Sequence, residues 1–440
     1  METYKSYKPS GVEWIGDIPA DWNVKKLKFS TITNEMVLPE KTEENFSFRY
    51  IDIGSVDGMG NILDSEEIIF GEAPSRARRI VKYGDTIIST VRTYLKAIAF
   101  IPEDSENRIC STGFAVVSPL QEYFVPKYLF YLCRSERFVD EVCSLSEGVS
   151  YPAIDSDSLR NIFALIPSQP EQTAIATYLD EETEQIDKLV ANKQKLIALL
   201  KEERTAIINH AITKGIDPSA ELKRSGLDWL DNIPEHWKIR RLKYVVLVKA
   251  RLGWKGLKAN EYVPEGYGFL STPNIKPKDI DFENINYITK ERYFESPEIM
   301  LEDGDVLLAK DGSTLGTVNV VKSLPFPSTV NSSIAVLRIT DKEELSPNFL
   351  RLFLASDYCQ NVIQMIKDGM GVPHLFQADI REFNLPLPPL PEQAEIVDEI
   401  KTKTSHIDVT ISRVESEVML MQEYRTALIS EVVTGKVKVV

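Results

Sequence analysis

The sequence predicts an α+β fold in which two strand-rich domains are separated by a pair of long helices that form an antiparallel coiled coil, with an internal pseudo-twofold repeat. Two observations support this prediction. The stretch SGVEWIGDIPADWNVKKLK at 10–28 is written again as SGLDWLDNIPEHWKIRRLK at 225–243. Each half of the chain also ends in a run of about forty residues that lacks glycine and proline and carries apolar residues at helical spacing.

The repeat continues beyond these two opening motifs. YGDTIIST at 83–90 corresponds to DGDVLLAK at 303–310, and Pro-Glu-Gln at 170–172 corresponds to Pro-Glu-Gln at 391–393. The offset grows from 215 to 221 residues along the chain. Solenoid repeats are only about 20–50 residues long. Each copy therefore contains a whole domain followed by a long helix.

The two long helices are predicted from their first turns and their apolar stripes. Proline in a first turn followed by glutamate is a helix-start signal, and two such stripes can pack against each other as a seam. A single amphipathic helix that lies on its own domain remains an alternative. Arg204 and Arg425 occupy equivalent positions in the seam, where they either fix the register or extend past it into solvent. The apolar seam residues are Leu179, Ile186, Val190, Ile197, Leu200 and Ile207, then Ile407, Ile411, Val414, Val418, Met421 and Leu428.

The segments from about 30 to 165 and from about 245 to 385 predict the two domains. They contain short β-rich runs, such as YIDIGSV and IAVLRI, that are bounded by Gly, Asp, Asn or Pro. Each segment then closes with a short helical stretch. Outside the repeated motifs the two segments differ in sequence and loop length, so the domains have diverged while the helices have not.

The composition is that of a soluble globular protein, with 43% hydrophobic and 27% charged residues. No apolar run approaches the roughly 18–20 residues that span a bilayer, and the charged first twenty residues do not form a signal peptide. We therefore expect a cytoplasmic protein that has no membrane partner. The four cysteines and four histidines are scattered, which argues against a disulfide framework and a metal site.

The net charge of −15 is unevenly distributed. The two helical segments 171–212 and 392–431 together carry −8, whereas 76–96 holds six bases against one acid and 238–260 holds eight bases and no acid. Such basic segments can neutralise nucleic-acid phosphates within an acidic chain. A solvated basic face that balances acids elsewhere remains the alternative.

Motifs that carry catalysis are missing. There is no Walker A sequence, no G-x-G-x-x-G after a strand, no nucleophile elbow and no H-E-x-x-H. The Pro-Pro-aromatic tetrad of adenine methyltransferases is missing as well. This favours a binding protein that has no catalytic residue, cofactor or metal of its own.

Several motifs together resemble those of the specificity subunits of type I restriction–modification enzymes. They are the repeated opening motif, the helix starts IPSQPEQ and PLPPLPEQ, GDVLLAKDGSTLGTV at 304–318, and Arg-Thr-Ala near the end of each helix. The resemblance spans the whole chain. It implies that each domain is a target recognition domain that reads one half of a bipartite, asymmetric double-stranded DNA site. It also implies that the helices set the gap between the half-sites and dock two modification subunits.

By the same resemblance this chain is not itself catalytic. S-adenosylmethionine belongs to the partner modification subunits, which methylate adenine, and ATP and Mg²⁺ belong to restriction subunits where these are present. The implied division of the chain is 1–168, the first target recognition domain with its N-terminal conserved segment; 169–212, the first spacer helix; 213–235, a linker with the repeated opening motif; 236–389, the second target recognition domain; and 390–440, the second spacer helix and C-terminal tail.

Residues expected to contact DNA lie in the loop after each Gly-Asp strand, in the turn before each long helix and in the two basic segments, since arginine, lysine and hydroxyl side chains bind phosphates and base edges. They are Arg76, Arg78, Arg79, Arg92, Thr93, Lys96, Ser150 and Tyr151 in the first half, and Lys249, Arg251, Lys255, Lys258, Lys310, Ser313, Thr314 and His374 in the second.

Two alternative functions stay open at this point. The chain could be a coiled-coil adaptor whose two domains bind proteins or carbohydrate. It could also serve a system that only modifies DNA or that carries a different nuclease, because the sequence carries no information on the partner's activity.

Overall fold

The computed structural model describes residues 2–63, 66–102, 107–251, 257, 259–276, 278–366 and 374–439. The chain divides into two units. Unit 1 comprises Met1–Gln194 with Glu415–Val440, and unit 2 comprises Lys195–Val414. Two long helices, α4 (Gln169–Lys214) and α9 (Leu390–Val433), each contribute one segment to either unit.

The sequence accounts for both ends of α4 and α9. Pro170 and Pro391 lie in the first turns, where a missing amide hydrogen costs nothing. Gly215 follows the last residue of α4 with φ +75°, and Gly435 lies just beyond α9 with φ +71°. Glycine adopts this left-handed conformation without strain, so it terminates a helix efficiently.

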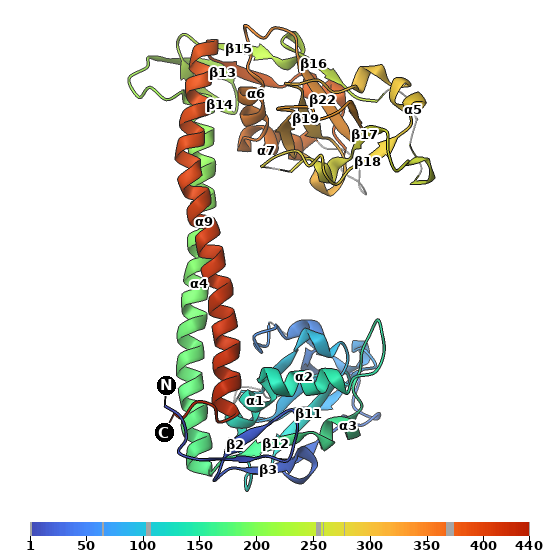
Figure 1. Ribbon diagram of the computed structural model, residues 1–440, viewed down its shortest axis with the longest axis vertical. Coiled ribbons are helices and arrows are strands. Elements are labelled where there is room, and N and C mark those ends of the chain that lie inside the picture. The colour runs from blue at the N-terminus through green and yellow to red at the C-terminus, as the bar shows by residue number, and fades with distance from the viewer. Residues whose placement is uncertain are drawn as a thin grey trace. The chain divides into compact units, whose positions relative to one another are not determined.

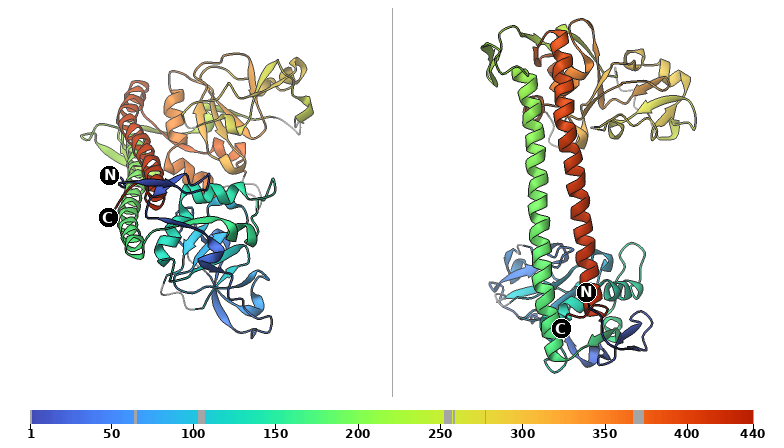
Figure 2. Two further views of the ribbon diagram at one scale, coloured as in Figure 1. Left: turned by 60° about the horizontal axis from the view of Figure 1, so that its bottom comes forward. Right: turned by 60° about the vertical axis from the view of Figure 1, so that its left-hand side comes forward.

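Within each unit the segments of α4 and α9 lie side by side (Figures 1 and 2). In unit 1 Asp187 pairs with Arg425 and Lys193 pairs with Glu417, so the numbering rises on one helix as it falls on the other and the helices run antiparallel. Apolar side chains from both helices share one core cluster in unit 1 and another in unit 2. The predicted fold class is confirmed.

Unit 1 contains two four-stranded sheets, in the orders β4-β11-β8-β9 and β6-β5-β10-β7, and two strand pairs, β1-β2 and β12-β3. In the second sheet β10 pairs with β5 in parallel and with β7 antiparallel. The strands are β1 (Tyr7–Pro9), β2 (Asp17–Pro19), β3 (Asn23–Lys26), β4 (Thr31–Thr33), β5 (Ser47–Ile51), β6 (Glu67–Ile69), β7 (Ala77–Ile80), β8 (Thr86–Ser89), β9 (Ile98–Phe100), β10 (Arg108–Ser111), β11 (Phe114–Pro119) and β12 (Phe163–Ile166). The shorter helices are α1 (Pro126–Arg134), α2 (Glu136–Ser144) and α3 (Ser156–Asn161).

Unit 2 repeats this plan with a four-stranded sheet β16-β22-β19-β20, a three-stranded sheet β18-β17-β21, and the pairs β13-β14 and β15-β23. The strands are β13 (Leu222–Leu227), β14 (Leu230–Pro234), β15 (Lys238–Arg241), β16 (Val246–Lys249), β17 (Tyr267–Leu270), β18 (Asn286–Ile288), β19 (Val306–Ala309), β20 (Val318–Val320), β21 (Ser328–Val330), β22 (Ile334–Ile339) and β23 (Asn384–Leu387). The helices are α5 (Lys290–Phe294), α6 (Pro347–Leu354), α7 (Asp357–Ile366) and α8 (Gln377–Arg381).

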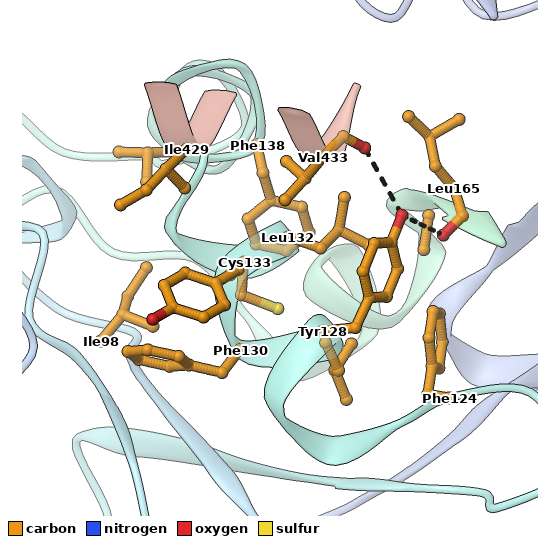
Figure 3. Packing of buried hydrophobic residues seen from close by; sticks show 14 of the residues in the cluster. Ile98, Phe124, Tyr128, Phe130, Leu132, Cys133, Phe138, Leu165, Ile429 and Val433 are labelled. Carbon is orange, nitrogen blue, oxygen red and sulfur yellow. Dashed lines mark hydrogen bonds between the residues drawn. The ribbon is translucent and has the colours of Figure 1, made fainter. Parts of the chain in front are cut away.

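The main core of unit 1 lies where α1 and α2 meet the end of α9. Figure 3 shows the fully buried Tyr128 of α1, whose hydroxyl donates towards the carbonyl oxygens of Leu165, at 3.2 Å, and Val433, at 3.4 Å. Phe138 and Ile429 pack in the same cluster. A strand of the domain and the last turn of the long helix are thus joined through one side chain.

A buried glutamine also fixes each long helix to its domain. The amide groups of Gln172 and Gln393 are fully buried, and each accepts one backbone N–H and donates to two backbone carbonyls. Gln172 contacts the Val125 N–H at 2.8 Å and the carbonyls of Tyr123 at 2.8 Å and Pro167 at 3.0 Å. Gln393 contacts the Ser346 N–H at 2.8 Å and the carbonyls of Glu344 at 2.8 Å and Pro388 at 2.9 Å.

The two opening motifs seal the ends of the long helices. Their second tryptophans, Trp22 and Trp237, are 1% and 0% exposed. In unit 1 Gly435, beyond the end of α9, approaches Trp22 and Pro19, and in unit 2 Gly215 approaches Trp237. The ends of the described chain also meet in unit 1 (Figure 1), where the backbone N–H of Lys438 donates to the Glu2 carbonyl at 2.8 Å. The repeated motif therefore packs, in each unit, against the end of one long helix.

The Gly-Asp turn before the central strand of each domain contains a buried aspartate. Asp85 accepts hydrogen bonds from the Lys82 N–H at 2.9 Å and the Ser118 hydroxyl at 2.6 Å. Asp305 accepts from the Arg338 guanidinium through Nε and Nη2, both at 2.7 Å. Burial raises the pKa of the Asp85 carboxyl. The hydrogen-bond partner of Asp85 is the neutral hydroxyl of Ser118, whereas that of Asp305 is the cationic guanidinium of Arg338.

Candidate nucleic-acid interface

Two separately predicted segments of unit 1 form one surface. The loop after β8 meets the turn before α3 through an isolated bridge between Val91 and Ala153. The Arg92 N–H donates to the Pro152 carbonyl at 2.7 Å, and the Ile154 N–H donates to the Thr90 carbonyl at 2.9 Å. These bonds bring Arg92, Thr93 and Lys96 together with Ser150 and Tyr151.

Backbone conformation explains how the loop presents its cations. Arg92 and Lys96 flank a short 3₁₀ helix, Thr93–Leu95, with φ values of +50° and +54°. Such angles are unfavourable for side chains larger than glycine and persist where neighbouring contacts hold them. Thr93 is buried and its hydroxyl lies 2.9 Å from that of Ser146. Thr93 thus anchors the loop while the side chains on either side of it face solvent.

The exposed side chains combine positive charge with aromatic surface. The Arg92 guanidinium lies over the Tyr151 ring, 4.6 Å from its centroid. Tyr151 is 65% exposed, and Ser150 and Lys96 are exposed as well. Tyr94, which was not among the predicted contacts, is 54% exposed. Arginine held on an aromatic face is pre-oriented for phosphates or for guanine.

Unit 2 has the same backbone arrangement with different side chains. An isolated bridge joins Asp311 to His374, and the Leu375 N–H donates to the Lys310 carbonyl at 2.9 Å. Lys310 is buried, with its ammonium 3.1 Å from the Asp311 carboxylate, which also contacts His374 Nδ1. In the 3₁₀ helix Gly312–Thr314, Ser313 is exposed and Thr314 is half-buried. One loop presents a cation and a phenol, and the other a Lys-Asp-His cluster and hydroxyls.

The basic segment 76–79 of unit 1 is divided by the alternation of β7. Arg76 is exposed, and Arg78 lies over the Phe70 ring, 4.7 Å from its centroid. Arg79 turns inward, where its Nη1 donates to the Asn34 amide oxygen and the Phe114 carbonyl. Burial lowers the pKa of Arg79. Arg79 therefore belongs to the packing of the domain.

Two of the four residues predicted in the basic segment of unit 2 lie among the described residues, and neither is fully exposed. Lys249, at the end of β16, is half-buried. The Arg251 side chain is only 3% exposed, lies 3.8 Å from Glu295, and has its pKa lowered by burial. Lys255 and Lys258 lie outside the described residues.

Every predicted apolar seam residue of α4 and α9 is buried or half-buried. The two seam arginines face carboxylates on the opposite helix within their own unit. Arg425 binds Asp187 with two hydrogen bonds, at 2.9 and 3.2 Å, and Arg204 binds Asp408 with one, at 2.8 Å. The two carboxylates, like the two arginines, are 221 residues apart in the sequence.

Within the described part of the chain, no cluster of three or more His, Cys, Asp or Glu side chains could hold a metal ion. The same residues include no helix that is both long enough and apolar enough to cross a bilayer.

Comparison with known protein families finds the same repeat in the chain. The family model described as type I restriction modification DNA specificity domain matches residues 19–201 and again 234–415. The MjaVIII specificity subunit of a type I restriction enzyme from Methanocaldococcus jannaschii is 25% identical over 316 residues, which cover 71% of this chain and 70% of the relative.

Two solved structures show the same fold. A chain from work on complex assembly and conformational transition of the type I R-M system is 22% identical, with a TM-score of 0.75, over 94% of this chain and 98% of its own length. The HsdS subunit from Thermoanaerobacter tengcongensis is 23% identical, with a TM-score of 0.52, over 96% and 98% of the two chains.

Proposed function

The chain belongs to the type I restriction modification DNA specificity family, and we propose that it reads a bipartite, asymmetric duplex site, one half-site with each strand-rich domain. As a member of this family it is the DNA specificity subunit, a non-catalytic component, of a type I restriction–modification system. The observation that carries the proposal is the repeated loop with unlike side chains. Equivalent backbones hold Arg92 over Tyr151 in one unit and Lys310 against Asp311 in the other.

A duplicated chain suits an asymmetric site. A homodimeric reader imposes its own symmetry on the DNA, so its site is palindromic. Two domains in one chain diverge independently and read unlike half-sites. We assign 1–168 and 236–389 to the two target recognition domains, and DNA contact to the exposed members of the predicted set.

The long helices are proposed to set the gap between half-sites and to dock two modification subunits. Leu199 of α4 and Leu420 of α9 are equivalent in the repeat, and they are 51% and 62% exposed. Exposed leucines at equivalent positions suit two copies of one protein partner. S-adenosylmethionine is assigned to those modification subunits. ATP and Mg²⁺ are assigned to restriction subunits, and the whole complex to the cytoplasm.

Methylation mapping tests this proposal. The chain is co-produced with its modification subunit, and methylated adenines are located in the host genome. Two fixed half-sites at one fixed gap are expected, and duplex binding should weaken steeply as salt rises. Methylation without a bipartite pattern, or DNA binding that is indifferent to salt and sequence, contradicts the proposal and favours an adaptor.

The gap has its own test. A seven-residue insertion in α4 between Gln194 and Lys195 with a matching insertion in α9 between Val414 and Glu415 preserves the apolar repeat. The insertion should change the mapped gap and leave both half-sites unchanged. Altered half-site bases would refute the assignment of spacing to the helices.

A further inference from the structure

Each unit exposes apolar side chains at equivalent positions just after its opening motif. In unit 1 Phe29 and Ile32 are 58% and 39% exposed, and in unit 2 Tyr244 and Leu247 are 66% and 51% exposed. Each aromatic residue follows a lysine whose ammonium lies near its ring, 5.1 Å from the Phe29 centroid and 5.4 Å from the Tyr244 centroid. We call Lys28, Phe29 and Ile32 edge patch 1, and Lys243, Tyr244 and Leu247 edge patch 2.

The local structure explains why these side chains face outward. Short 3₁₀ helices, Leu27–Phe29 and Leu242–Tyr244, bury their leucines and turn their last residues to solvent. The strands that follow, β4 and β16, are the first strands of their sheets and pair only with β11 and β22 among the described strands. Each patch therefore places an exposed aromatic residue beside the unpaired edge of a sheet. Both features favour association with another protein.

The patches repeat where other surfaces of the domains do not. Tyr83 is 56% exposed in unit 1, but the equivalent position in unit 2 is Asp303. The candidate DNA loops likewise differ between the units. Since two unlike half-sites select unlike surfaces, a surface kept in both copies fits a partner that both units share.

Ion pairing disfavours DNA phosphate as that partner at edge patch 2, because the cations there are already bound to carboxylates of the domain. Glu382 lies 2.8 Å from the ammonium of Lys243 and 2.9 Å from the guanidinium of Arg241. Arg240 is paired in turn with Glu344 at 3.1 Å. Phosphate brought to this patch would meet those carboxylates, whereas a protein surface of mixed charge would not be repelled.

We propose that the edge patches are docking sites for two copies of the modification subunit, one on each patch. The inference rests on the proposed function and locates a contact outside α4 and α9. The partner surface is apolar, to cover the aromatic and aliphatic side chains, with a carboxylate placed to meet Lys28 of edge patch 1. Aromatic residues at the centre of such surfaces contribute much of the binding free energy.

The test uses the full chain co-produced with the modification subunit, and native mass spectrometry with titration measures stoichiometry and affinity. Wild type should bind two copies. Phe29→Asp and Tyr244→Asp should each weaken the binding of one copy by about thirtyfold or more, and the double variant should lose both. Tyr83→Asp, which changes an exposed aromatic outside the patches, is the matched control. Phe29→Leu, which keeps an apolar side chain, should weaken binding less than Phe29→Asp does. A wild-type thermal unfolding midpoint for the two Asp variants excludes a general folding defect.

Three results would overturn the inference. Both single variants could keep two copies at wild-type affinity. The patch variants could keep two copies but lose DNA affinity and salt dependence, which would assign the patches to DNA. The chain alone could dimerise through the patches, which would assign them to a second copy of itself. Failure of the proposed function is a separate result, because wild type would then bind its partner but methylate no bipartite site.

Discussion

The buried Arg425 of α9 and Asp187 of α4 form a two-bond ion pair across the helix seam, with Nε 2.9 Å and Nη2 3.2 Å from the carboxylate oxygens. Its counterpart, Arg204 with Asp408, makes one bond in a more open place: the Arg204 side chain is 38% exposed, that of Arg425 only 10%. The repeat has kept the pair but not its burial.

This difference predicts unequal costs for two matched substitutions. Arg425→Ala leaves the Asp187 carboxylate without its cation and should lower the free energy of unfolding by about 2–3 kcal/mol. Arg204→Ala should cost less than about 1 kcal/mol, because the pair is solvated. Urea unfolding of the full chain measures both. Equal losses would show that burial does not govern the strength of these pairs.

The buried amides predict a second loss of stability. Gln172→Leu removes one acceptor and two donors from backbone groups, and leaving these unpaired should cost about 2–4 kcal/mol. Gln393→Leu should cost a similar amount, because its three contacts are equivalent. Gln194→Leu, at an exposed position of the same helix, is the control and should change stability by less than about 0.5 kcal/mol. A loss no larger than that of the control would show that the joint does not depend on the amide.

The glycines beyond the two long helices predict an asymmetry. A Cβ at Gly435 would lie 2.5 Å from the Pro19 ring, whereas a Cβ at Gly215 would find its nearest neighbours at 3.3 Å. Both positions have positive φ, so alanine costs about 1–2 kcal/mol at either. Gly435→Ala should therefore lower the unfolding midpoint clearly more than Gly215→Ala in thermal denaturation. The reverse order would mean that Pro19 moves freely.

The Asp85 carboxyl predicts a pH dependence. Burial raises its pKa above the ordinary value of 3.8, so the native state binds that proton more tightly than the unfolded state does. The free energy of unfolding should then fall as pH rises from about 3.8 through the raised pKa, and level off above it. Asp85→Asn should abolish this pH-dependent part of the free energy of unfolding. Compared with wild type, the variant should gain most stability at neutral pH.

The equivalent carboxylate is the control for that experiment. Asp305→Asn breaks the buried pair with Arg338 and should destabilise the chain at neutral pH by about 3 kcal/mol. Denaturation curves collected between pH 4 and 7 compare the two variants directly. Two variants that respond alike would show that Ser118 and Arg338 are equivalent partners.

The candidate interface predicts that a substitution in the loop of unit 1 weakens binding to one half-site only. Arg92→Ala should weaken binding of duplexes that contain the first half-site by about tenfold to a hundredfold. If Arg92 contacts a base, Arg92→Lys should not restore discrimination at that position, because lysine lacks the planar fork. Arg160→Ala, an exposed arginine of α3 paired with Asp157, is the control. Fluorescence anisotropy at several salt concentrations separates phosphate from base contact.

Much of the fold could be predicted because its signals are local or repeated. The helical periodicity and the Pro-Glu-Gln starts indicated α4 and α9, and the repeat at an offset of 215 to 221 residues indicated that unit 2 copies unit 1. The sequence predicts only that each domain segment closes with a short helical stretch, which in unit 1 is the stretch 126–142. The structure divides it at Ser135, whose side chain accepts the Phe138 N–H and starts α2.

The site was less predictable because it depends on tertiary contacts. Arg76, Arg78 and Arg79 form one basic run in the sequence, but the structure turns Arg79 to the interior oxygens of Asn34 and Phe114. The bridge between Val91 and Ala153, which unites two candidate segments, joins residues far apart in the sequence. Tyr94 had a local signal, since it stands between two cations, but its exposure depends on the left-handed residues at both ends of the loop.

The joint at Gly435 has a consequence for the order of the two modules along the chain. In unit 2, α4 runs through Gly215 directly into the opening motif that packs on it, so the joint is covalent. In unit 1, α9 ends against an opening motif near the other terminus of the chain, and the joint is non-covalent. Trp22 packs on it, the Tyr7 hydroxyl donates to the Gly435 carbonyl at 3.1 Å, and the Lys438 amide N–H donates to the Glu2 carbonyl at 2.8 Å. The chain thus consists of two equivalent modules with two equivalent joints, one of which is covalent and one of which is not. A short peptide that joined residue 439 to residue 2 would make both joints covalent. A new break between 215 and 222 would then give a permuted chain in which the second module precedes the first, while the packing of Trp22 and Trp237 is retained.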